Sequence, residues 1–249
     1  MKNILNKKLV ERYSRQIVLK DVGPIGQKKI INSKVLVVGA GGLGCPVIDY
    51  LSRSGVGNIG VVDDDRVNIS NIHRQSIYNS KDIGKFKVNA IKQKIKLINP
   101  QVKIKTFKLR IQKKNIEKIL KSYDFIVDGS DNFKTKFLLN EYSLNYKKIL
   151  IVGAISKMDG HVFTFDFKNK NDPCLKCFYQ TEPSDGILNC EYEGILGPVA
   201  GIIGTMLANE VLKKILGVGQ NLNGFILIID LLNLRFRKVK LNKTKIKWK

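Results

Sequence analysis

The chain has 249 residues, which is enough for one large α/β domain with a core on both faces of its sheet. Hydrophobic residues make up 43% of it, as in an ordinary globular protein, and its longest uncharged apolar run, around 194–209, is too short to span a membrane. The formal net charge of +23 raises the question of nucleic acid, but lysines occur throughout the chain without a clean basic face, so we expect neither nucleic acid nor a membrane as a partner.

The N-terminal part, 1–32, predicts a helical segment over about 6–32. Charges in MKNILNKKLVERYSRQ lie too close together for the apolar region of a secretory signal, which favours a cytoplasmic protein. Arg15 lies in this polar stretch, and taken alone it is best interpreted as a solvated charge on a helix.

The next part, 33–155, begins with the pattern of a nucleotide-binding βαβ unit. The run Val35–Val38 is typical of a buried parallel strand, and Gly39, Gly41 and Gly44 follow it with the spacing of a phosphate-binding turn. A helix predicted from about position 43 would direct its free N–H groups at a bound phosphate. A glycine turn alone is weak support, but together with the strand and the helix it favours a nucleotide site.

Polar side chains after the second predicted strand indicate which nucleotide is bound. Asp63 lies about 20 residues beyond the glycine turn, where a ribose-binding carboxylate is expected. Asn71, Arg74 and Lys87 follow, and such side chains suit a triphosphate better than the pyrophosphate of NAD. The sequence therefore favours a nucleoside triphosphate, with an NAD-dependent oxidoreductase as the alternative.

The segment FIVDGSDN at 125–132 predicts another buried strand that ends in acidic residues. Ligands of open α/β sheets bind at the carboxyl ends of strands, and a carboxylate beside a triphosphate suits Mg²⁺. We assign this role to Asp131. The alternative is that Asp131 or Asn132 caps the helix that follows, and capping is compatible with the metal role.

The last part, 156–249, predicts an extension of the same sheet. A strand at 149–155 leads to an alternating segment at 161–167, which we expect to be an exposed strand, and a loop at 168–193 carries three cysteines. A helix at 198–216 and strands at 225–232 and 234–241 complete the chain. The fold class is thus a single Rossmann-like α/β domain with a mixed sheet, parallel in its N-terminal part and antiparallel in its C-terminal extension.

Six segments of the chain resemble the ThiF/MoeB/HesA adenylyltransferases, bacterial relatives of the ubiquitin-activating enzymes. They cover nearly the whole chain in the same order: RYSRQI at 12–17, GAGGLG at 39–44, DDDRVNISNIHRQ at 63–75, GKFKV at 84–88, DGSDN at 128–132 and CEYEGILGPVAGIIGTMLANEVLK at 190–213.

The resemblance implies a reaction and a set of partners. Such enzymes use ATP and Mg²⁺ to form an acyl-adenylate on the C-terminal Gly-Gly of a small ubiquitin-like sulfur carrier protein, in thiamine or molybdopterin biosynthesis. The second half of the chain would form the carrier-binding face. The family's homodimer would complete the site, and a separate donor such as a cysteine desulfurase or a rhodanese would supply sulfur.

The resemblance also implies residue roles. Arg15 would reach the ATP of the partner subunit, and Asp131 would organise Mg²⁺. Arg15, Arg74 and Lys87 would neutralise charge during the reaction. The nucleotide-binding set implied is Gly39, Gly41, Gly42, Gly44, Asp63, Asp65, Ser70, Asn71, Arg74, Lys87, Asp131 and Asn132.

The cysteines depart from the family pattern. Cys174 and Cys177 have the spacing of half a structural zinc site, but the final stretch, 221–249, lacks the second cysteine pair that completes it in many relatives. His161 and Cys190 could complete it only if the fold brought them together, so we expect no zinc. Cys190 lies where some relatives carry a catalytic cysteine. We expect it to act in sulfur transfer and adenylation to survive its loss, although the nearby Glu191 and Glu193 oppose a lowered thiol pKa.

Two other classes of function remain as alternatives. An NAD-dependent oxidoreductase would share the strand, the glycine turn and the acid, but it would not explain Arg15, Arg74, Lys87 and Asp131 together. A noncatalytic basic scaffold would explain the charge alone.

Overall fold

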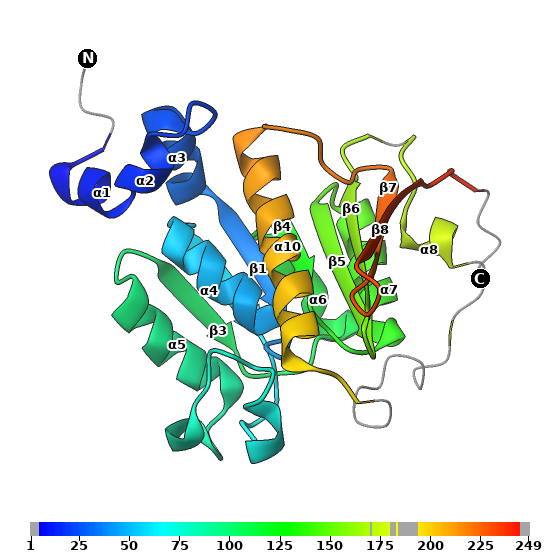
Figure 1. Cartoon of the computed structure of the whole chain (residues 1–249), viewed down its shortest axis with the longest axis horizontal. Helices are drawn as coiled ribbons and strands as arrows, with labels where there is room; N and C mark the ends of the chain where they lie inside the picture. Colours follow the sequence, from blue (N-terminus) through cyan, green and yellow to red (C-terminus); the bar gives the residue numbers. More distant parts are fainter. Residues whose placement is uncertain (1–4, 170, 180–182, 184–193, 245–249) are drawn as a thin grey trace.

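The computed structural model describes residues 5–169, 171–179, 183 and 194–244. One eight-stranded sheet extends through this part of the chain, in the order β3-β2-β1-β4-β5-β6-β7-β8 (Figure 1). Its strands are β1 (Lys34–Val38), β2 (Asn58–Val62), β3 (Lys103–Phe107), β4 (Phe125–Asp128), β5 (Ile149–Ser156), β6 (Asp159–Asp166), β7 (Phe225–Asp230) and β8 (Arg235–Lys240).

The sheet is mixed in the way that the sequence predicts. Strands β1 to β5 pair in parallel, while β5, β6, β7 and β8 pair antiparallel to their neighbours. The two kinds of pairing meet at β5, which accepts β4 on one side and the hairpin partner β6 on the other. The predicted fold class is confirmed.

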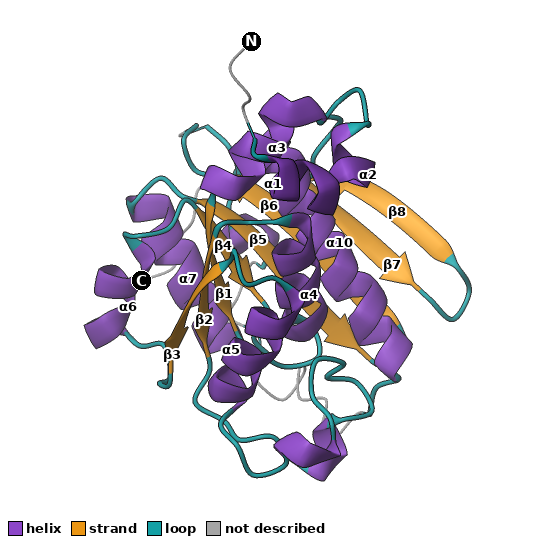
Figure 2. Ribbon diagram, turned by 90° about the vertical axis from the view of Figure 1, so that its left-hand side faces the viewer, coloured by secondary structure: helices purple, strands orange, loops and turns teal. Residues whose placement is uncertain are grey.

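Helices cover both faces of the sheet (Figure 2). On one face lie α3 (Gly23–Asn32), α4 (Gly44–Ser54), α5 (Lys87–Ile98) and α10 (Gly197–Leu216), and on the other lie α6 (Lys113–Leu120), α7 (Phe133–Asn145) and α8 (Leu175–Phe178). The short helices α1 (Lys7–Arg12) and α2 (Ser14–Ile17) precede α3 and complete the predicted N-terminal helical segment.

The two-layer cover explains why β1 is apolar without interruption. Val35 and Val37 pack into the core beneath α4 and α10, whereas Leu36 and Val38 pack into the core beneath α6 and α7. None of the four is more than 4% exposed. A strand buried on both faces needs no polar alternation, and β1 is the middle strand of the parallel part of the sheet, β3-β2-β1-β4-β5.

The expectation of an exposed strand at 161–167 is wrong. Strand β6 lies between β5 and β7, and Val162, Phe163, Thr164 and Phe165 are fully buried. Phe163 and Phe165 pack toward α7 and α8, while the Thr164 hydroxyl on the other face donates a hydrogen bond to Glu210 Oε2 of α10 at 2.8 Å. Successive side chains of β6 therefore alternate between two buried faces of the sheet. On one of these faces the polar Thr164 is satisfied by a hydrogen bond to α10.

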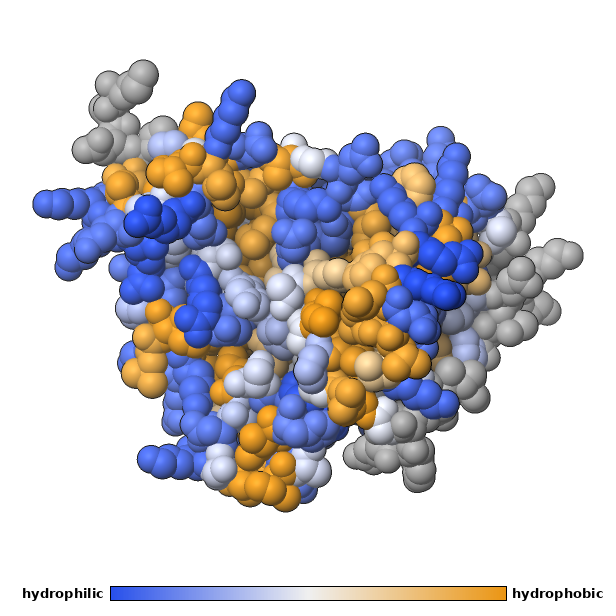
Figure 3. Space-filling model, viewed as in Figure 1, coloured by the Kyte–Doolittle hydropathy of each residue, from blue (hydrophilic) through white to orange (hydrophobic). Residues whose placement is uncertain are grey.

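The far edge of the sheet is the exposed part of this fold. All residues of β8 are exposed, and arginine and lysine side chains on this edge oppose pairing with other strands. Figure 3 shows a hydrophobic surface beside α10, over β7 and β8. Among the described helices, none has the length and apolar character needed to cross a membrane.

Candidate nucleotide site

A cavity of about 450 Å³ opens at the carboxyl ends of β1, β2 and β4. Strand β2 pairs with one edge of β1, and β4 pairs with its other edge. The cavity therefore lies at the point where the strand order reverses. Open α/β sheets bind ligands at this point, and the volume falls within the range of small-molecule sites.

The fold brings together in this cavity most of the side chains that the sequence singles out for a nucleotide. They come from the segments that follow β1, β2 and β4 and from the start of α5. Those that line the cavity are Gly39, Gly41, Gly42, Asp63, Asp65, Ser70, Asn71, Arg74, Lys87, Asp131 and Asn132.

The glycine turn between β1 and α4 is shaped by two close backbone contacts. Gly39 has φ +93°, and a Cβ atom there would lie 2.7 Å from the carbonyl oxygen of Gly129. A Cβ on Gly44 would lie 1.9 Å from the Gly39 oxygen, so Gly44 serves helix packing and does not itself line the cavity. Gly41 has open space, with the nearest atom, Gln75 Nε2, at 3.7 Å from its Cβ position. This space lets a ligand approach the backbone just before the N-terminus of α4.

Asp63 is fixed by the backbone around it. Its Oδ2 accepts a hydrogen bond from the Ala40 N–H at 2.8 Å, and its Oδ1 accepts one from the Asp65 N–H at 2.9 Å. Burial raises the pKa of Asp63, and the charge of Lys87 partly counteracts that rise. The carboxylate is therefore held at the rim of the glycine turn, in a position suited to a ribose hydroxyl.

Lys87 is the first residue of α5, and its side chain is almost completely buried. Its Nζ lies 2.8 Å from Asp65 Oδ2, whose side chain is largely exposed to the cavity. Lys87 thus presents a positive charge to the cavity while Asp65 holds that charge in place. An anionic ligand could replace Asp65 as its partner.

Ser70, Asn71 and Arg74 are placed by a short 3₁₀ helix, η1 (Ile69–Asn71). Asn68 Oδ1 accepts from the Ser70 N–H at 3.0 Å, and Asn71 Oδ1 accepts from the Asn68 N–H at 3.2 Å, which closes a capping box. The Asn71 oxygen is thus engaged, while its amide group keeps two N–H donors. Arg74 Nη1 donates to the Ser70 carbonyl oxygen at 2.9 Å and contacts His73 Nε2 at 2.7 Å. Ser70 and His73 together therefore orient the Arg74 guanidinium.

The turn after β4 supplies the remaining carboxylate. Asn132 is the N-cap of α7, since its Oδ1 accepts from the Thr135 N–H at 2.9 Å. Asp131 accepts a long hydrogen bond from Asn132 Nδ2, at 3.3 Å, which leaves its exposed carboxylate open to the cavity. Capping therefore falls to Asn132, and Asp131 remains available for another role.

The oxygen donors at this cavity fit Mg²⁺, which prefers hard oxygen ligands shared with phosphate. Asp131 faces the cavity, and Asp63, Asp64 and Asp65 form the only described group of three or more acidic, histidine or cysteine side chains that could share an ion. Asp63 and Asp65 are already engaged by N–H groups and Lys87. Asp64 and Asp131 also line the cavity, and the assignment of Mg²⁺ to Asp131 stays a prediction.

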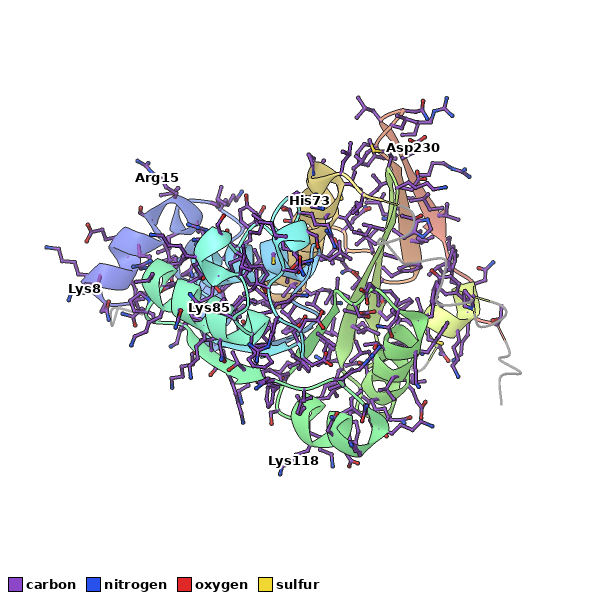
Figure 4. All side chains as sticks on the ribbon, turned by 90° about the horizontal axis from the view of Figure 1, so that it is seen from below. Lys8, Arg15, His73, Lys85, Lys118 and Asp230 are labelled. Atoms are coloured by element: carbon purple, nitrogen blue, oxygen red, sulfur yellow. The ribbon has the colours of Figure 1, made fainter. Side chains whose placement is uncertain are left out.

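Of the predicted site residues that the structure describes, Gly44 and Arg15 do not line the cavity. Arg15 is exposed on α2 and does not line the cavity, and Figure 4 shows it on the N-terminal helices, well to the side of the loop that carries His73. Cys190 lies outside the described residues, so its predicted role in sulfur transfer stays a prediction.

Cys174 and Cys177 lie at α8, with their sulfur atoms 3.8 Å apart. Among the described residues, no third histidine, cysteine or acidic side chain forms a possible metal-binding group with this pair. The ring of His161 packs against Phe163 and Phe178. The expectation of no zinc stays a prediction. Cys45 is fully buried, and burial raises its pKa to about 12, so it is a packed side chain.

Sequence reasoning missed part of the cavity wall. Arg66, Arg110 and Ile111 line it, and the last two follow strand β3. The alternating stretch VKIKTF was the available signal for this strand, and recognising it would have placed the following loop at the same edge of the sheet.

Several known proteins resemble this chain. A profile of the ThiF family matches residues 13–247. A sulfur carrier protein adenylyltransferase of Thermus thermophilus is 39% identical over 241 residues, covering 95% of this chain and 89% of the relative. A probable molybdopterin-synthase adenylyltransferase of Gracilaria tenuistipitata var. liui is 37% identical over 243 residues, covering 96% of this chain and 68% of the relative.

A longer relative and two solved structures extend the comparison. An adenylyltransferase and sulfurtransferase of Aedes aegypti is 38% identical over 244 residues, which cover 98% of this chain but 55% of the relative. The crystal structure of PaaA superposes with a TM-score of 0.83 at 25% identity, covering 98% of this chain and 77% of PaaA. MccB of E. coli with ATP superposes with a TM-score of 0.81 at 22% identity, covering 98% and 74%, and this likeness concerns the fold alone.

Proposed function

The chain belongs to the ThiF family, and from this premise we propose that it is an ATP-dependent adenylyltransferase acting on the C-terminal carboxylate of a small sulfur carrier protein. One observation carries the proposal: Arg74, Lys87, Asp63 and Asp131 face one cavity beside a glycine turn. A pair of cations, a ribose-type acid and a free carboxylate is the set that a nucleoside triphosphate requires.

The proposed reaction needs charge neutralisation more than acid–base chemistry. A carboxylate oxygen of the carrier bonds to the α-phosphorus of ATP, the bond to the bridging oxygen breaks, and pyrophosphate leaves with the electron pair. A carboxylate is already ionised near neutral pH, so no general base is required. The barrier comes from bringing two anions together, and cations lower it by stabilising the transition state.

The described side chains divide this work. Arg74, oriented by Ser70 and His73, and Lys87, which would exchange Asp65 for phosphate, neutralise the developing charge. Asp63 accepts the ribose hydroxyls, and the N–H groups at the start of α4 receive phosphate oxygens. Bound Mg²⁺, held by Asp131, would add charge neutralisation on the phosphates.

The names of two relatives support a choice of carrier, and the pathway is part of the proposal. One relative acts on a sulfur carrier protein and another on molybdopterin synthase, so the proposed acceptor is a small carrier ending in Gly-Gly, in molybdopterin or thiamine synthesis. We assign its docking to the antiparallel part of the sheet, where hydrophobic surface lies over β7 and β8 (Figure 3). A separate sulfur donor would act on the adenylate, in the cytoplasm.

The proposed active unit is a homodimer. Arg15 lies outside its own chain's cavity, and nearby Val18, Leu19 and Ile25 have exposed fractions of 74%, 56% and 65%. Exposed apolar side chains of this kind suit burial against a second copy, which would bring Arg15 to the partner's nucleotide.

Exchange of radioactive pyrophosphate into ATP tests the function directly. Candidate carriers ending in Gly-Gly are added one at a time, and the matched control is the same carrier without its terminal glycine. We expect exchange that requires both Mg²⁺ and the intact carrier, and the carrier that supports it identifies the pathway. No exchange with any carrier, together with tight binding of NAD instead of ATP, would overturn the proposal in favour of an oxidoreductase.

A further inference from the structure

Lys136 of α7 is a lysine with 1% exposure, and neither the sequence pattern nor the proposed chemistry accounts for it. Its Nζ donates to three acceptors: Asp128 Oδ2 at 3.1 Å, the Ser130 carbonyl oxygen at 2.8 Å and the Gly153 carbonyl oxygen at 2.6 Å. An ammonium group has three N–H donors, so every one of them is used.

The three acceptors connect two strands and one turn. Asp128 ends β4, Gly153 lies in the middle of β5, and Ser130 belongs to the turn that leads into α7. Asp128 Oδ1 in turn accepts from the Ser130 N–H at 2.9 Å and from the Ser130 hydroxyl at 2.6 Å. The segment 128–130 is therefore held at both of its ends by the pair Asp128–Lys136.

This segment bears directly on the nucleotide cavity. Gly129 packs against the glycine turn, since a Cβ on it would lie 3.1 Å from the Gly44 nitrogen, and it lines the cavity with Ser130 and Asp131. Asp131 follows Ser130 without an intervening residue. Any shift of the segment would move the Asp131 carboxylate relative to the phosphate side of the cavity.

Stability alone is a poor reason for such a pair. Burying two charges costs solvation, and apolar residues of similar volume often replace a buried ion pair at no loss of stability. Residues that hydrogen-bond to a metal ligand from behind, by contrast, fix the orientation of that ligand. Their loss commonly lowers metal affinity by about 10- to 100-fold.

We propose that Lys136 is a positioning residue for the nucleotide site: through Asp128 and Ser130 it holds the Asp131 carboxylate where it meets the metal-bound phosphates. This inference rests on the proposed binding of Mg²⁺ and ATP, and it does not require that the carrier be known. Lys136 does not touch the cavity itself, because it is not among the lining residues.

The test compares Lys136→Met with Lys134→Met, which makes the same change two residues away on the exposed face of α7. Calorimetry measures the Kd of ATP with Mg²⁺ and with EDTA, in the absence of any carrier. For Lys136→Met we expect the Kd with Mg²⁺ to rise at least about 10-fold, while the Kd with EDTA changes little. Lys134→Met should match the wild type in both.

A double variant separates positioning from folding. Lys136→Met leaves the Asp128 charge buried without its cationic partner and can lose stability for that reason, whereas Asp128→Asn with Lys136→Met removes both charges. The double variant should unfold cooperatively near the wild-type temperature and still bind Mg²⁺–ATP at least about 10-fold more weakly.

Two results would overturn the inference. One is a folded variant, single or double, whose Kd for ATP is unchanged with Mg²⁺ and with EDTA alike. The other is a failure of both variants to fold, because Lys136 would then determine folding itself. A wild-type protein that binds Mg²⁺–ATP but adenylates no carrier would contradict the proposed function and leave this binding test in force.

Discussion

Gly39 meets two separate requirements, and a matched pair of substitutions can separate them. Its φ of +93° disfavours any side chain, and a Cβ would also lie 2.7 Å from the Gly129 oxygen. Gly84 has a similar φ of +82° but no atom within 4 Å of a Cβ position. We expect Gly84→Ala to cost about 1–2 kcal/mol of unfolding free energy from backbone strain.

Gly39→Ala should cost at least about 2 kcal/mol more than Gly84→Ala, because the turn must also separate from Gly129. Urea unfolding of the two variants measures the difference. Equal losses would mean that the contact between the two turns relaxes freely and does not fix the shape of the cavity.

Asp131 gives the second prediction at this scale. Asp131→Asn keeps the size of the side chain but removes its charge, so we expect Mg²⁺-dependent pyrophosphate exchange to fall at least about 100-fold with the thermal unfolding temperature unchanged. The control is Asp124→Asn, which alters an exposed acid just before the opposite end of β4. Normal exchange by the Asp131 variant would contradict the metal assignment.

At the scale of elements, Asp82 connects η2 (Ser80–Asp82) to the helix that carries Lys87. Its carboxylate accepts from the Asn79 N–H and pairs with Lys85 at 3.2 Å and with Lys94 of α5 at 3.3 Å. Burial alone would raise its pKa, but these partners outweigh burial and lower the pKa below the ordinary value of 3.8. The folded state therefore favours the charged form.

This shift fixes the sign of a pH effect. The stability that Asp82 contributes is fully present above pH 3.8 and is lost as pH falls through its lower folded pKa. Asp82→Asn should thus cost about 2 kcal/mol near pH 7, and the difference from the wild type should shrink in acid. Denaturant unfolding from about pH 7 down to about pH 2 measures it, because the change is expected below pH 3.8.

The control for this series is Asp49→Asn, which removes an exposed pair with Arg53 on one helix and should cost less than about 0.5 kcal/mol. If Asp82→Asn lost the same small amount at every pH, Asp82 would not link η2 to α5 energetically.

Elements were predictable where their pattern is local. The run before Gly39, the helix after it and the strand ending at Asp128 follow from periodicity and turn residues, because backbone sterics and burial act over a few positions. The error at β6 has a different cause. Thr164 is buried because Glu210 satisfies it from a helix 46 residues away, and no window of sequence contains that partner.

The same reasoning applies to the site. Gly39, Asp63 and Lys87 follow a recognisable order along the chain and could be proposed from sequence. Lys136 could not, since a lysine within KTK on a helix predicts an exposed charge, and its burial depends on acceptors from β4, β5 and the turn between β4 and α7. Long-range contacts decide such residues.

At the scale of the whole molecule, the position of Arg15 raises the question of how many chains make one site. If two copies associate so that Arg15 reaches the partner's cavity, each site combines Arg74 from one chain with Arg15 from the other. Arg15→Ala and Arg74→Ala should then each inactivate the homodimer, because both changes damage both sites.

Mixed dimers distinguish this arrangement from a site within one chain. When Arg15→Ala and Arg74→Ala chains exchange freely, each mixed dimer regains one intact site, and the mixture should reach about a quarter of wild-type exchange activity, since half of the dimers are mixed and half of their sites are intact. Mixing Arg15→Ala with the doubly substituted chain restores no site and is the matched control. If Arg15 acted on its own chain's nucleotide, neither mixture would recover activity, so recovery in the first mixture alone is the result that only a shared site produces.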